Sequence, residues 1–167
     1  MNKQEFGNLV MESERLLYRV AKSVLHDDND CADAIGEAVT NAFEKLHTLK
    51  KDEYARTWLV RILINECYSL KRYAQRFSYS DDEEVLEVIR EQENEQEEYK
   101  ELYEAIEKLS SKNRLVIILY YLEGYSMREI AQILRIRESA VRKRMERARN
   151  ELKEFLREDG YLWTSLV

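Results

Sequence analysis

Apolar residues recur at the helical period in three segments of the N-terminal half, residues 9–25, 31–49 and 54–76. The apolar stripes are Leu9, Leu16, Leu17, Val20 and Val24; then Ile35, Val39, Ala42 and Leu46; then Leu59, Ile62, Leu63, Cys67 and Leu70. Asp30 is the expected N-cap of the second helix, and the polar residues 50–53 separate it from the third. Three helices of this length can close a small core, to which we assign Trp58.

The C-terminal segment contains the start and stop signals of several shorter helices. We expect a helix over 99–109, a second one capped by Ser110 or Ser111, and a C-terminal turn at Gly124. Ser126 and Glu129 have the spacing of a capping box at the start of the next helix. The apolar side chains of these helices are Leu115, Ile118, Leu119 and Leu122, then Ile130, Ala131, Ile133 and Leu134.

A short turn over 135–138 leads to a long helix over 139–156. Its buried stripe would be Val141, Met145, Ala148 and Leu152. A short capped helix, a turn and a longer helix form the helix-turn-helix pattern.

Proline is absent and glycine occurs four times, which favours an all-α fold. Residues 79–98 are dense in acidic side chains with few apolar ones, typical of a linker. We therefore expect two small helical domains, 1–78 and 99–167, joined by an acidic linker over 79–98.

The net charge of −6 conceals an alternation of basic and acidic stretches. Residues 50–76 hold seven basic and three acidic side chains, 81–107 hold two and thirteen, and 135–157 hold nine and four. The distribution decides whether a surface attracts nucleic acid, so two basic surfaces remain candidates.

The last helix suits the major groove of duplex DNA, because the side chains at its N-terminal end are small and those along its sides are cationic. Ser139 and Ala140 are the small residues at that end. Ser126 caps the preceding helix, whose free N-terminal amides can face a phosphate. The cations expected to contact phosphates and base edges are Arg137, Arg142, Lys143, Arg144 and Arg147.

The string SMREIAQILRIRESAVRKRMERARNELKEFL (126–156) resembles region four of bacterial sigma-70 factors. Helix-turn-helix response regulators share much of that pattern, and the first half separates the two classes. DCADAIGE (30–37) and TWLVRILIN (57–65), with LKR (70–72), resemble the family's region two. Regions two and four alone are the layout of the extracytoplasmic-function (ECF) subgroup. The departures are Gly36, Ser69, Arg135 and Ala140, where Gln, Asp, Gly and Thr are common.

The resemblance implies a promoter-specific initiation factor that binds RNA polymerase core through the beta-prime clamp and the beta flap. The C-terminal helix-turn-helix would recognise the upstream (−35) element, and the N-terminal domain would melt the downstream (−10) element. Downstream contacts are expected from Lys50, Lys51, Tyr54, Arg56, Arg61, Asn65, Lys71 and Arg72. Core-polymerase contacts are expected from Asp30, Asp33, Ile35, Glu37 and Asn41. The acidic linker would thread toward the active-site channel, and an anti-sigma factor is an expected partner.

Other classes of protein find little support. Cys31 and Cys67 lack the spacing of a zinc site, and His26 and His47 are isolated, so we expect no metal and no cofactor. No glycine-rich phosphate loop or nucleophile motif indicates an enzyme. No apolar run is long enough for a membrane span, which favours the cytoplasm. The alternatives are a stand-alone helix-turn-helix regulator and a sigma-like interaction protein without promoter activity.

Overall fold

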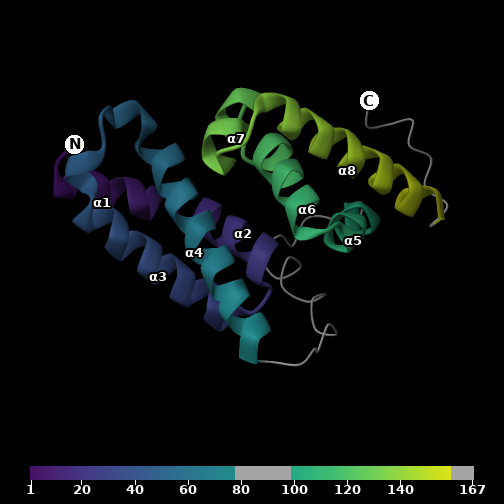
Figure 1. Ribbon diagram of the computed structural model, residues 1–167, viewed down its shortest axis with the longest axis horizontal. Coiled ribbons are helices and arrows are strands. Elements are labelled where there is room, and N and C mark those ends of the chain that lie inside the picture. Colours follow the sequence, from purple (N-terminus) through teal and green to yellow (C-terminus); the bar gives the residue numbers. More distant parts are fainter. Residues whose placement is uncertain (78–98, 159–167) are drawn as a thin grey trace.

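The computed structural model describes residues 1–77 and 99–158, and this part of the chain is helical with no β-strand (Figure 1). The N-terminal half contains α1 (Lys3–Glu12), α2 (Glu14–Leu25), α3 (Asp28–Glu44) and α4 (Ala55–Phe77), with short 3₁₀ turns at Leu46–Thr48 and Asp52–Tyr54. The C-terminal half contains α5 (Lys100–Lys108), α6 (Ser111–Ile117), the π-helical turn η4 (Ile118–Leu122), α7 (Met127–Leu134) and α8 (Glu138–Glu158). The all-α prediction is confirmed.

The first predicted helix, 9–25, is two helices that meet at Ser13. A capping box between Asn2 and Glu5 starts α1 well before the predicted boundary. In α1, Phe6 is fully buried and contacts Phe43 and Trp58 edge-on, with ring centroids 5.0 and 6.0 Å away. Trp58 therefore packs against the core, as predicted.

Helix α3 begins earlier than predicted, because Asp27 rather than Asp30 is its N-cap. The Asp27 carboxylate accepts a hydrogen bond of 3.0 Å from the Asp30 amide. The buried side of α3 consists of small residues, namely Cys31, Ala34, Ala38 and Ala42. The predicted stripe is thus only partly right, since Ile35 and Val39 are half-buried.

The caps of the C-terminal half follow the predictions. Ser110 accepts a hydrogen bond from the Asn113 amide, Gly124 has φ +72°, and Ser126 and Glu129 form the capping box. Arg135 ends α7 in the left-handed region, at φ 53° and ψ 43°. The stripe of α8 is buried as expected, but Leu122 is exposed, because the helix widens into a π turn at Ile118–Leu122.

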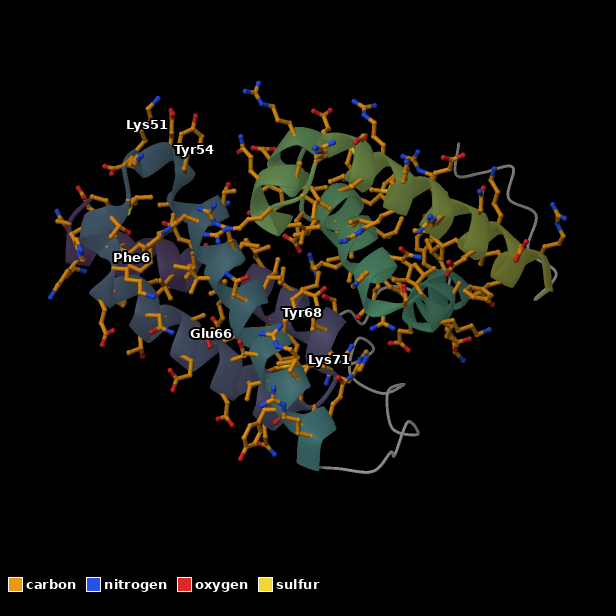
Figure 2. All side chains as sticks on the ribbon, viewed as in Figure 1. Phe6, Lys51, Tyr54, Glu66, Tyr68 and Lys71 are labelled. Carbon is orange, nitrogen blue, oxygen red and sulfur yellow. The ribbon has the colours of Figure 1, made fainter. Side chains whose placement is uncertain are left out.

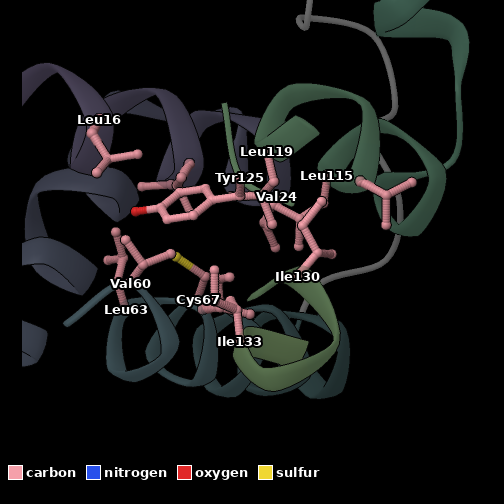
Figure 3. Close-up of a cluster of buried hydrophobic side chains, with 14 of the residues drawn as sticks. Leu16, Val24, Val60, Leu63, Cys67, Leu115, Leu119, Tyr125, Ile130 and Ile133 are labelled. Atoms are coloured by element: carbon pink, nitrogen blue, oxygen red, sulfur yellow. The ribbon is translucent and has the colours of Figure 1, made fainter. Parts of the chain in front are cut away.

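The two halves share one continuous set of buried apolar side chains. Helices α2 and α4 pack against α6 and α7, and the close-up in Figure 3 shows Tyr125 lying between Leu16 and Val60 on one side and Leu119 on the other. The predicted linker, 79–98, lies outside the described residues. None of the described helices is both long and apolar enough to cross a membrane.

Candidate nucleic-acid interface

Helices α7 and α8, joined through the left-handed Arg135, form the helix-turn-helix. The Ser126 amide donates to Glu129 Oε2 at 2.7 Å, and the Glu129 amide donates to Ser126 Oγ at 3.2 Å. First-turn amides have no acceptor within their own helix, so the start of α7 carries partial positive charge. This end of α7 can therefore attract a phosphate.

A surface hollow of about 910 Å³ lies between the start of α7 and one side of α8. Arg128, Arg142 and Arg149 are among its lining residues, together with Ser126 and Glu138. Two of these cations are already oriented by neighbours. Arg142 bonds Glu138 at 2.8 Å, and Arg149 Nε donates to the Tyr121 hydroxyl at 2.9 Å. The hollow thus joins a helix N-terminus to cationic side chains of the following helix.

The predicted upstream-element residues are placed on two sides of α8. Arg137, Ser139, Arg142, Lys143 and Arg147 are exposed. Ala140 and Arg144 are half-buried. Burial raises the pKa of the Tyr68 hydroxyl, and the nearby Arg144 charge opposes that rise. Arg144 is therefore less exposed than the other cations and lies near enough to α4 for its charge to act on Tyr68.

The loop before α4 brings two predicted downstream-element residues, Lys51 and Tyr54, together (Figure 2). Lys50, Lys51 and Tyr54 are exposed, and the Lys51 ammonium lies 5.8 Å from the centroid of the Tyr54 ring. The arrangement offers an aromatic face beside a cation, which suits an unstacked base with its backbone.

The predicted contacts along α4 divide into exposed and covered side chains. Arg56, Asn65 and Arg72 are exposed, whereas Arg61 and Lys71 are half-buried. Burial and the neighbouring charge of Arg135 lower the pKa of Arg61. Lys71 Nζ donates to Ser111 Oγ at 3.1 Å. The C-terminal half therefore lies over part of this predicted surface.

The predicted polymerase-contact residues also fall into an exposed group and a covered group. Asp33 and Glu37 are exposed on α3, and Asp30 is half-buried, where burial and the charges of Asp27 and Asp33 raise its pKa. Ile35 packs against the core, and the Asn41 amide donates to Glu66 of α4 at 2.9 Å. The exposed acidic side chains form the outer face of α3, while Asn41 joins α3 to α4.

Sequence reasoning missed Arg114, which is 5% exposed and lies where α6 meets α2. It directly precedes the apolar run Leu115–Leu119, and no pattern in the sequence marks a buried cation there. Sequence reasoning also missed the Tyr121–Arg149 pair, because the π turn that exposes Tyr121 has no sequence signature.

The two cysteine thiols are buried and apart from these surfaces. Burial raises the pKa of Cys31 to about 11 and that of Cys67 to about 12, so both stay protonated and are poor nucleophiles. Within residues 1–77 and 99–158, no group of three or more His, Cys, Asp or Glu side chains is placed to hold a metal ion.

Comparison with known families accounts for both halves. Residues 9–77 match sigma-70 region 2, and residues 99–152 match sigma-70, region 4. The ECF RNA polymerase sigma factor SigM of Mycobacterium tuberculosis is 27% identical over 165 residues, which cover 99% of this chain and 82% of SigM.

Two solved structures have a similar fold. A structure of CnrH in complex with the cytosolic domain of CnrY has a TM-score of 0.69 and 28% identity, covering 95% of this chain and 91% of that one. The sigma factor RpoE in complex with the anti-sigma factor NepR, from Bartonella quintana, has a TM-score of 0.78 and 23% identity, covering 92% and 98%.

The fold and the matched regions define a transcription initiation factor rather than a stand-alone helix-turn-helix regulator. The chain belongs to the sigma-70 family of bacterial RNA polymerase sigma factors, in the ECF subgroup. Its function is promoter-specific initiation of transcription with RNA polymerase.

Proposed function

We propose that the exposed cationic side of α8 and the start of α7 recognise the upstream promoter element. The observation that carries this assignment is the hollow in which the N-terminus of α7 meets Arg142 and Arg149. The α7 N-terminus binds a phosphate there, while Arg137, Ser139 and Lys143 at the first turns of α8 reach base edges in the major groove. Arg147, one turn further along, contacts the backbone.

The N-terminal half, 1–78, opens and holds the downstream element. Support comes from the exposed Lys51–Tyr54 pair, which offers a stacking face and a cation to an unpaired base. The α4 residues Arg56, Arg61, Asn65, Lys71 and Arg72 then follow the separated strand. Duplex opening is driven by binding of unpaired bases and backbone, and the protein itself forms no covalent bond.

The outer face of α3 docks on the polymerase core at the beta-prime clamp. Asp33 and Glu37 support this role, because they are exposed and acidic. The C-terminal half, 99–167, contacts the beta flap, and the acidic segment 79–98 is the linker between the two. The protein acts in the cytoplasm, where its polymerase is, and is not an enzyme.

An anti-sigma factor is the expected regulatory partner. One of the similar solved structures is a sigma factor bound to an anti-sigma factor, and another is CnrH bound to the cytosolic domain of CnrY. We extend this mode of regulation to the present chain.

Run-off transcription tests the proposal. Purified core polymerase is mixed with fragments of the source genome, with and without the protein, and the transcripts are mapped. New, defined start sites that need both the protein and core support the proposal. Tight duplex binding without core, and no new start site, would indicate a stand-alone regulator instead.

A further inference from the structure

The hollow beside the start of α7 contains a cation that an uncharged group orients. Arg149 Nε of α8 donates a 2.9 Å hydrogen bond to the hydroxyl oxygen of Tyr121, 28 positions earlier in the chain. The guanidinium carbon of Arg149 also lies 5.7 Å from the centroid of the Tyr121 ring. A hydrogen bond and a cation–π contact therefore restrain the same guanidinium.

Arg149 differs from Arg142 in the charge of its partner. Arg142 is paired with the Glu138 carboxylate at 2.8 Å, which offsets its positive charge. The second carboxylate of the hollow, Glu129, is engaged in the capping box of α7. The phenol hydroxyl of Tyr121 is an uncharged acceptor, so it orients Arg149 without offsetting the charge of the guanidinium.

The hydrogen bond to Tyr121 leaves the outer end of the Arg149 guanidinium available. Within residues 1–77 and 99–158, neither terminal nitrogen of Arg149 forms a hydrogen bond or an ion pair. The two terminal nitrogens of an arginine form a planar fork that matches two oxygens of one phosphate. Arg149 and the start of α7 border the same hollow, so a phosphate placed there can contact both.

Tyr121 is itself supported by its neighbour in the chain. Tyr121 is 55% exposed, yet its ring centroid lies 4.9 Å from that of Tyr120 in an edge-to-face arrangement. Tyr120 is half-buried, packs against the core and lines the hollow. The core therefore supports Tyr120, Tyr120 supports Tyr121, and Tyr121 supports Arg149.

We propose that Tyr121 is a positioning residue for DNA binding, which holds Arg149 with its terminal nitrogens available to a backbone phosphate in the hollow. The inference rests on the proposed role of this hollow in the upstream element. An unrestrained arginine loses rotamer freedom when it binds a phosphate, and Tyr121 removes most of that loss before DNA arrives. A phosphate contact carries no base information, so Tyr121 strengthens binding to any duplex sequence.

A double-variant cycle on the whole chain tests this inference with a fluorescent, mixed-sequence DNA duplex at low salt. Tyr121→Phe keeps the ring but removes the hydroxyl, and it should weaken duplex binding about fivefold. Arg149→Ala removes the phosphate contact itself and should weaken binding about tenfold. In the Arg149→Ala background, Tyr121→Phe should cause no further loss, because Tyr121 acts through Arg149.

Two further measurements separate positioning from a general structural role. Arg149→Ala should lower the slope of log affinity against log salt by about 1, whereas Tyr121→Phe, which keeps every charge, should leave the slope at the wild-type value. In NMR relaxation, the Arg149 Nε–H group should be ordered in wild type and mobile in Tyr121→Phe. A variant that acted only by weakening the fold would lose affinity in the Arg149→Ala background as well.

Tyr99→Phe is the matched control, because it removes the hydroxyl of another exposed tyrosine that does not line the hollow. It should bind the duplex as wild type does. Wild-type affinity in Tyr121→Phe or in Arg149→Ala, or a Tyr121→Phe loss that persists without Arg149, would overturn the inference. Run-off transcription by wild type tests the proposed function separately, since an active factor without this coupling refutes only the role of Tyr121.

Discussion

The Ser23 carbonyl oxygen near the end of α2 accepts a 2.9 Å hydrogen bond from Arg114, 91 positions later in the chain. The last carbonyls of a helix lack intrahelical donors and carry partial negative charge. Arg114 supplies both a donor and a positive charge at this end of α2. A side chain of the C-terminal half thus caps a helix of the N-terminal half.

Arg142→Ala tests the upstream-element surface. Arg142 is exposed and lines the hollow beside the start of α7. Loss of its contact should weaken promoter binding by the polymerase-bound protein about tenfold, measured by fluorescence anisotropy. Affinity for core polymerase alone should not change.

Arg142 is a sharper probe than Arg144, because Arg142 is exposed and Arg144 is half-buried. Arg157→Ala near the end of α8 removes the same charge far from the hollow and should leave promoter binding near wild type. If Arg142→Ala reduces core affinity instead, the assignment of this face to DNA is wrong.

Asp33→Arg tests the polymerase-docking face of α3. Asp33 is exposed, so reversal of its charge should not affect folding but should oppose docking. Core affinity should fall about tenfold or more in a titration without DNA. Glu12→Arg at the end of α1 makes the same charge change on an exposed residue and serves as control. Equal losses in both variants would show a general charge effect rather than a docking site.

Local sequence signals predicted the C-terminal elements well, because caps and turns depend on neighbouring residues. The Ser126–Glu129 box and the positive φ of Gly124 are both of this kind. The helix before Ser13 was missed; its Phe6 packs against Phe43, far along the chain, and such a contact has no local signal.

In the candidate site, too, features set by neighbouring residues were predictable and features set by distant contacts were not. Helical periodicity correctly placed Arg142 and Lys143 on the exposed side of α8. The covering of Arg61 and Lys71 depends on how α6 and α7 pack on α4, and that packing has no local signal. Periodicity identifies the face of a helix that is apolar, but not which polar side chains a distant segment covers.

Arg135→Gly tests the strain in the turn of the helix-turn-helix. A non-glycine residue in the left-handed region costs about 1 kcal/mol, which glycine avoids. Arg135→Ala removes the same charge near Arg61 but keeps the strain, so it is the matched control. The glycine variant should exceed the alanine variant in free energy of unfolding by roughly 0.5–1 kcal/mol in urea denaturation. An alanine variant as stable as the glycine variant would mean that the turn is unstrained.

His26→Asn tests the electrostatics of the interface between the halves. Burial, with the charges of Arg114, Lys71 and Lys22, lowers the pKa of His26 to about 4 from an ordinary value of 6.5. Between these values the unfolded chain binds more protons than the folded one, so stability should fall as pH drops from about 6.5 to about 4. Asparagine is polar and does not titrate, so it removes the change of charge without placing an apolar side chain at this position. Urea denaturation of both proteins across this pH window should show that the free energy of unfolding falls more steeply for wild type than for the variant. The carboxylates common to both proteins cancel in the difference between the two curves. Parallel curves would mean that His26 is as easily protonated in the folded protein as in the unfolded chain.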